Sequence, residues 1–221
     1  QTSAEFPEKF RVDIPSSISN ANEMKSTEDD TISGNEMYEH LTNFIAIGDA
    51  AAELVEEIML AIGEYNLSQE ISFTYDGDDG REKFLQVTSD VTFENKNWAF
   101  QLTVTDTQSE NEPDGGIAMQ VFWNVNPIDG IAILKPYNID RINDTELGEA
   151  MYRIDYNELG ANGYEAEMTV YITDLPMPSP LVDPYAVNHL KMFAGKNGDY
   201  VDVYGNSNHP NAKFYNDDVG F

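Results

Sequence analysis

A short turn holds the densest group of candidate metal ligands in the sequence. Asp76, Asp78 and Asp79 alternate there with two glycines. Ca²⁺ takes about six to eight oxygen ligands, often from flexible loops of this kind. An EF-hand loop starting at Asp76 would need an acid, a glycine and a glutamate at the positions held by Gly80, Arg81 and Val87. The motif therefore fails, and calcium binding at these three aspartates competes with the simpler interpretation of a solvated hairpin turn.

Aromatic side chains form the second group of candidates. Phe122, Tyr171, Tyr200 and Tyr204 fall on the alternation phase opposite to the expected core face of their strands. Exposed aromatic rings on a sheet can stack on sugars or line a surface that binds a partner. The alternative is ordinary cross-strand packing. We therefore treat these four residues as a candidate ligand-binding face.

No catalytic signature stands out. His40, His189 and His209 lack a short metal-ligand spacing, and no G-x-S-x-G nucleophile motif is present. Pairs of carboxylates could hydrolyse glycans, but forty acidic residues bring such pairs together by chance. Phosphate-binding glycine loops are absent, so we expect no nucleotide cofactor.

The charge balance constrains the partners. Forty Asp and Glu face twelve Lys and Arg, for a formal net charge of −28, and no basic residue occurs from Ser26 to Gly80. Phosphate binding depends on basic side chains that release counterions, so nucleic acid is an unsuitable partner. The charge favours either plain solubility or the binding of cations and cationic partners.

The sequence contains no cysteine, which excludes disulfides and thiolate zinc sites and favours an exported protein. No apolar run reaches the length of a membrane span, so we expect no transmembrane segment. We expect a signal peptide, and with it a lipid-bearing cysteine, to precede Gln1, which would place the protein in the periplasm or on the outer cell surface.

One long amphipathic helix is predicted from residue 34 or 35 to about residue 66. Its stripe repeats every three or four residues: Met37, Leu41, Phe44, Gly48, Ala51, Val55, Ile58, Ile62 and Tyr65. The polar face is acidic and has no basic partner, so packing of the stripe must stabilise this helix. A coiled coil of two copies is the alternative, but two such acidic faces would repel, and we expect a monomer.

Beyond the helix the apolar period changes from helical to strand-like. Nine strands are expected, at 71–75, 83–89, 97–105, 117–125, 131–135, 151–156, 164–172, 189–194 and 199–204. Turn residues at 114–116, 127–130 and 195–198 indicate hairpins, which make neighbouring strands antiparallel. Longer connectors are expected at 137–150, with a helical turn, and at 174–188, which is rich in proline.

These elements assemble into one α+β domain at 34–221, in which the helix packs on a curved antiparallel β-meander, a half-barrel of about nine strands. Residues 1–33 are expected to be a polar tether. Within it, the alternation of Phe10, Val12 and Ile14 suggests a short edge strand that ends at Pro15.

The order of acidic tether, helix and cysteine-free meander rich in Asn, Tyr and Asp resembles uncharacterised exported lipoproteins of Bacteroidetes-type bacteria. The segment Phe6–Ser19 contributes to this resemblance. The resemblance implies a location outside the cytoplasm and says nothing about catalysis.

The expected function is therefore a non-enzymatic binding or structural role in the cell envelope, with a hydrophobic or glycan ligand held between helix and sheet or on the sheet face. Two alternatives stay open: an acid-dependent glycan hydrolase that uses paired carboxylates, and a calcium-dependent adhesion module. No cofactor is expected other than calcium in the last case.

Overall fold

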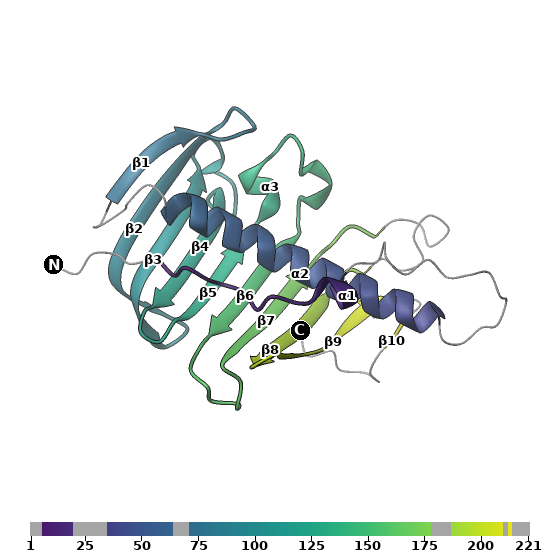
Figure 1. Cartoon of the computed structure of the whole chain (residues 1–221). Helices are drawn as coiled ribbons and strands as arrows, with labels where there is room; N and C mark the ends of the chain where they lie inside the picture. Colours follow the sequence, from purple (N-terminus) through teal and green to yellow (C-terminus); the bar gives the residue numbers. More distant parts are fainter. Residues whose placement is uncertain (1–5, 20–34, 64–70, 178–186, 210–211, 214–221) are drawn as a thin grey trace.

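The protein is described here by a computed structural model that places residues 6–19, 35–63, 71–177, 187–209 and 212–213. A long helix, α2 (Asn35–Gly63), lies across one antiparallel sheet, as Figure 1 shows. The predicted α+β class is therefore confirmed, and α2 begins where the sequence predicted. No helix among these residues is long and apolar enough to cross a membrane.

The sheet is a meander in which each strand pairs with the next one along the chain. Its strands are β1 (Ile71–Asp76), β2 (Glu82–Phe93), β3 (Lys96–Asp106), β4 (Ile117–Asn124), β5 (Asp129–Leu134), β6 (Met151–Asn157), β7 (Ala166–Thr173), β8 (Leu190–Asn197), β9 (Tyr200–His209) and β10 (Ala212–Lys213). The first nine correspond to the nine predicted strands. All pairs are antiparallel, and β1 and β10 form the two edges, so the sheet is not closed into a barrel.

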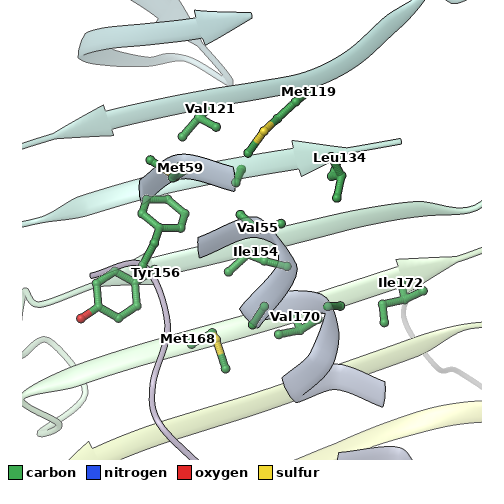
Figure 2. Close-up of a cluster of buried hydrophobic side chains, with 14 of the residues drawn as sticks. Val55, Met59, Met119, Val121, Leu134, Ile154, Tyr156, Met168, Val170 and Ile172 are labelled. Atoms are coloured by element: carbon green, nitrogen blue, oxygen red, sulfur yellow. The ribbon is translucent and has the colours of Figure 1, made fainter. Parts of the chain in front are cut away.

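The main hydrophobic cluster contains buried side chains from both α2 and the sheet. Val55 and Met59 of the helix belong to it together with Ile154, Tyr156 and other inward-facing strand residues (Figure 2). The helix backbone also approaches the sheet closely at Gly48, where an added Cβ would lie 2.6 Å from Cε of Met192. The glycine within the predicted stripe therefore marks a close approach between the helix and β8.

The predicted edge strand near the N-terminus is not formed. Residues 6–15 belong to no helix or strand, and the short helix α1 (Ser16–Ser19) follows them. Phe10, Val12 and Ile14 are nevertheless buried in the main cluster. These side chains were expected to lie in a polar tether, not in the core. The segment is fixed by contacts with α2 and the sheet face instead of by a strand ladder.

The connector between β5 and β6 has the predicted helical turn. It contains α3 (Pro136–Ile139) and the 3-10 turn η2 (Thr145–Leu147). Figure 1 shows α3 on one side of α2 and the N-terminal segment on the other. Different parts of the chain therefore lie beside the two sides of the helix. Most of the predicted connector 174–188 lies outside the described residues.

Candidate ligand groove beside the long helix

Phe122, one of the four predicted surface aromatics, is buried instead. It is 3% exposed and stacks on Phe93 with ring centroids 4.0 Å apart. Together with Trp98 and Ile131 it forms a second, smaller hydrophobic cluster, separate from the main one. Phe122 is therefore a packing residue and is not accessible to a ligand.

The other three predicted aromatics, Tyr171, Tyr200 and Tyr204, are at least partly exposed. Tyr200 is 80% exposed, and Tyr204 stacks on Phe193 with centroids 4.6 Å apart. Tyr171 lies near two cations instead, at 5.9 Å from the Arg153 guanidinium and 5.2 Å from Nζ of Lys191. Neither pocket described below is lined by any of these tyrosines.

The aspartate-rich turn divides into two parts with different roles. The Asp79 side chain is buried, and its carboxylate accepts hydrogen bonds from Nζ of Lys83 (3.0 Å) and from the backbone N–H groups of Arg81 (3.0 Å) and Arg141 (3.1 Å). Asp76 and Asp78 are exposed. Within the described ranges, no group of three or more His, Cys, Asp or Glu side chains could hold a metal ion. Asp79 is thus committed to protein contacts, unlike the calcium ligand predicted at this position.

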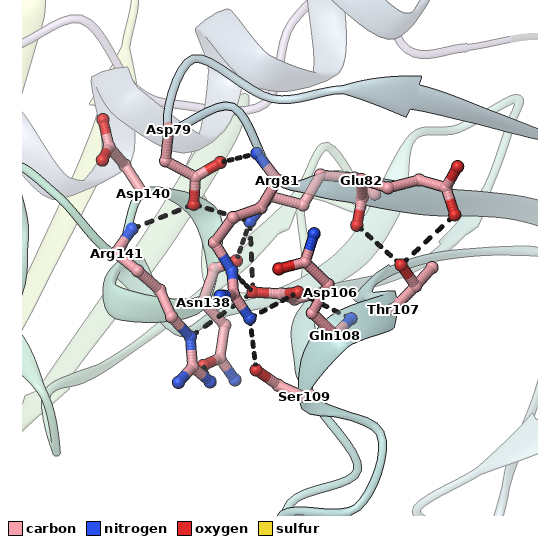
Figure 3. A network of polar contacts seen from close by, with 12 residues as sticks. Asp79, Arg81, Glu82, Asp106, Thr107, Gln108, Ser109, Asn138, Asp140 and Arg141 are labelled. Atoms are coloured by element: carbon pink, nitrogen blue, oxygen red, sulfur yellow. Dashed lines mark hydrogen bonds and ion pairs between the residues drawn. The ribbon is translucent and has the colours of Figure 1, made fainter.

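Asp79 belongs to a buried polar network that sequence reasoning missed (Figure 3). Lys83 is 1% exposed, and its ammonium donates to Asp79, to the backbone carbonyl of Asn138 (2.9 Å) and to Asp106 (3.4 Å). Arg81 forms two hydrogen bonds to the Asp106 carboxylate, at 2.7 and 3.0 Å. The one sequence feature that could have indicated this network is that Arg81 and Lys83 are the first Lys or Arg residues after Lys25. A buried lysine requires such partners, because an unpaired buried charge is very costly.

The network shifts the pKa values of its carboxyl groups downward. Burial alone would raise the pKa of Asp106, but hydrogen bonds from Arg81 and the charge of Lys83 lower it below its usual range. Asp114 behaves similarly: burial opposes ionisation, but hydrogen bonds from Lys135, Gly116 and Asn138 lower its pKa to about 2. These bonds fix α3 against the start of β4, so the network anchors the connector that runs beside α2.

One side of α2, which we call the closed flank, is covered by residues 6–15. Phe10 is 1% exposed, and its ring lies so near β5 that a Cβ on Gly130 would be 2.6 Å from it. The backbone N–H of Phe10 donates to Glu56 at 2.7 Å. Arg11 forms ion pairs with Glu56 at 3.0 Å and with Asp49 at 3.1 Å. This flank is therefore filled by the chain itself.

The other side, the open flank, borders two pockets that meet at Leu54. The Leu147 pocket, of about 860 Å³, lies between the helix and the end of the β5–β6 connector. Its lining residues are Asn43, Ile47, Ala50, Ala51, Leu54, Glu146, Leu147, Tyr152, Leu175, Pro176, Met177 and Val187. The Asp144 pocket, of about 640 Å³, continues along the helix and is lined by Leu54, Ile58, Ala61, Ile62, Phe73, Tyr75, Asp76, Gly77, Asp78, Lys83, Leu85, Ile139, Asp140 and Asp144.

The two pockets together form what we call the groove. Residues Ile47, Leu54 and Ile58 follow one line along the helix, because their spacings of seven and four residues are close to two turns and one turn. Each pocket has a volume typical of small-molecule sites, and both linings are mainly apolar. Leu54, at their junction, is 37% exposed. The groove thus offers an elongated apolar surface.

Carboxylates concentrate at one end of the groove. Asp140 accepts hydrogen bonds from the backbone N–H groups of Ile142 and Asn143, which lower its pKa. Burial, followed by the charge of Asp140, raises the pKa of Asp144 above its usual range. Asp76 and Asp78 line the same pocket. The two connector aspartates therefore have pKa values that are shifted in opposite directions.

Of the three histidines, only the side chain of His189 is described. It lies 3.9 Å from Asp174 and lines neither pocket. The side chains of His40 and His209 lie outside the described set. Comparison of the chain with protein-family models, with curated proteins and with solved structures found no match, so the geometry of the groove alone carries the functional argument.

Proposed function

We propose that this protein binds an elongated apolar ligand in the groove between α2 and the β5–β6 connector. In this account the open sheet curves around α2 as a half-barrel, and the open flank of the helix is left for the ligand. The single observation that supports this most strongly is that two apolar pockets meet at the half-exposed Leu54. Burying such a surface contributes roughly 25 cal/mol per Å² of apolar area.

The proposal includes a location in the cell envelope, where apolar molecules must be carried through an aqueous space. Its support is the absence of cysteine from the sequence and the strongly acidic composition. The complete gene sequence would test this location. We expect it to encode a signal peptide upstream of this segment, and a reading frame without a signal peptide would contradict the location.

A neutral, apolar dye such as N-phenyl-1-naphthylamine tests the binding function. Its fluorescence should increase on addition of the protein and saturate with one binding isotherm. Leu54→Asp places a charge at the junction of the two pockets and should weaken binding at least tenfold, about 1.4 kcal/mol.

Leu60→Asp is the matched control, because Leu60 is on the same helix, is 44% exposed and lines neither pocket. Dye binding should be unchanged in this variant. Equal losses in both variants, or no saturable binding to the unmodified protein, would contradict the proposal.

A glycan hydrolase that uses paired carboxylates is a second candidate, because Asp144 and Asp140 have pKa values shifted apart in one pocket. Such a separation is typical of acid and base pairs in catalysis. Asp144 would then be the general acid. Release of nitrophenol from aryl glycosides at mildly acidic pH, lost in Asp144→Asn, would support this candidate; no turnover across a panel of such substrates would remove it.

A further inference from the structure

The charges around the groove determine which head group an apolar ligand can carry. Lys83 is the only basic residue among those that line the two pockets, whereas Asp76, Asp78, Asp140, Asp144 and Glu146 are acidic. Opposite charges attract and like charges repel at contact distances even in a partly hydrated site. The balance of these residues therefore bears directly on ligand selection.

Lys83 is not available to an anionic ligand. An ammonium group has three N–H donors. Those of Lys83 face the Asp79 carboxylate at 3.0 Å, the Asn138 carbonyl at 2.9 Å and the Asp106 carboxylate at 3.4 Å. Withdrawing this ammonium would remove the only ion-pair partner that the buried Asp79 carboxylate has among the described residues, and a buried charge without its partner is strongly unfavourable. A fatty acid or a phosphate ester would thus meet carboxylates in the groove and no free cation.

Asp144 is the acidic group best placed to receive a cation. The Asp140 carboxylate already accepts three hydrogen bonds, from Ile142, from Asn143 and from the Asn143 side chain. In contrast, no hydrogen bond to the Asp144 side chain occurs among the described residues, although this side chain is half-buried at the wall of the pocket. A donor on the ligand would satisfy it.

We propose that the groove selects amphiphiles with a protonated amine head, with the ammonium at Asp144 and the apolar chain extending past Leu54 towards Ile47. This inference rests on the proposed function and adds the chemical class of the ligand. The apolar stretch from Ile58 to Ile47 covers roughly 16 Å of helix, at about 1.5 Å per residue, which suits a single extended alkyl chain. Two ligand properties, chain and head, are thereby matched to two parts of one groove.

Three probes with the same chain and different heads test this directly: decylammonium, decan-1-ol and decanoate, each below its micelle concentration and at neutral pH. Each competes with the neutral dye. Decylammonium should bind best and decanoate worst, with about a tenfold ratio between them, as expected for one added attraction and one added repulsion. In about 1 M salt, where the Debye length is about 3 Å, the ratio should shrink.

Asp144→Asn should reduce the ratio about fivefold, because the ratio compares two probes on the same variant and depends on the charge at this position. Glu149→Gln is the matched control, because Glu149 is an exposed acid of the same connector that lines neither pocket. It should leave the ratio unchanged.

The outcomes separate the two proposals. If the dye binds but decanoate competes as well as decylammonium, the head-group inference is wrong and the apolar groove stands. If Asp144→Asn keeps the full ratio, the cation does not lie at Asp144. If neither dye nor any probe binds, the proposed function itself fails. The salt series on the unmodified protein decides the head-group question even if the variant does not fold.

Discussion

The two flanks of α2 are made from the same helix but are completed in different ways. On the closed flank, Phe10 is buried in the main cluster, and Arg11 forms ion pairs with Asp49 and Glu56 of the helix. On the open flank, Leu54 and Ile58 border pockets of about 860 and 640 Å³. We propose that this difference gives the two flanks different roles: the closed flank contributes stability, and the open flank binds a ligand.

The largest expected effect is on the closed flank. Phe10→Ala should lower the free energy of unfolding by about 3–5 kcal/mol, because it empties a fully buried site between β5 and the helix. Urea denaturation followed by far-ultraviolet circular dichroism would measure it. A loss below about 1 kcal/mol would show that the N-terminal segment does not seal this flank.

Lowering the pH should destabilise the β5–β6 connector, which forms one wall of the open flank. Groups with lowered pKa values, such as Asp114, Asp106 and Asp79, contribute stability above their unfolded pKa of 3.8 and lose it as the pH falls through the folded value. For Asp114, whose folded pKa is about 2, this amounts to about 2 kcal/mol, lost between pH 4 and pH 2.

The closed flank carries two acids whose pKa values are shifted in opposite directions. Burial tends to raise the pKa of Asp13, but the hydrogen bond and charge of Lys9 lower it. Burial raises the pKa of Asp49, so its protonation favours the folded state, and its contribution is lost as the pH rises through that value. Amide hydrogen exchange at about pH 3 should show protection lost at residues 136–150 before it is lost at the Phe10 amide, which donates to Glu56, because the acid responses of Asp13 and Asp49 oppose each other. Asp114→Asn should flatten the acid response; an unchanged pH profile in this variant would exclude Asp114 as the anchor.

A smaller effect is expected from the ion pairs of the closed flank. Arg11→Gln removes the partner of Asp49 and Glu56, whose side chains are each 15% exposed, and should cost about 1–2 kcal/mol. Lys9→Gln is the control, because the Lys9–Asp13 pair is largely exposed and should contribute below about 1 kcal/mol. Equal losses in urea melts of the two variants would contradict the sealing role of Arg11.

The smallest effect on stability should come from the open flank. Leu54→Ala should change the free energy of unfolding by less than about 1 kcal/mol, because the side chain is already 37% exposed. The same variant should weaken dye binding about threefold to tenfold, as expected when an apolar contact is removed from a binding pocket. A large loss of stability with unchanged binding would assign Leu54 to the core instead.

The repeating apolar patterns made most of the fold predictable, whereas the structure of the irregular segments could not be predicted from the sequence. The stripe from Leu41 to Ile62 and the alternation of residues such as Val121 and Trp123 predicted α2 and the nine longer strands, because burial on one face imposes those periods. Phe10, Val12 and Ile14 alternate as well, but nothing local distinguishes a strand from an extended segment that packs over a helix.

The groove could not be predicted because it depends on contacts far apart in sequence. Asp144 and Leu54 line the same pocket. The connector that carries Asp144 is held beside the helix by contacts of Asn138 with Asp114 and with Lys83, which in turn pairs with Asp79. The turn at residues 76–79 was considered from the sequence as a calcium site. The buried acid of this turn, Asp79, pairs with Lys83, whereas the exposed Asp76 and Asp78 line the Asp144 pocket.

The most direct test of the groove is a methyl NMR titration of the protein, labelled at Ile and Leu methyl groups, with decylammonium. The account predicts that the methyl signals of Ile47, Leu54 and Ile58 shift and saturate together, whereas those of Ile45 and Leu60, which line neither pocket, do not move. Saturable shifts confined to Ile45 or Leu60, or no saturable shift at Leu54, would contradict a ligand groove on the open flank of α2.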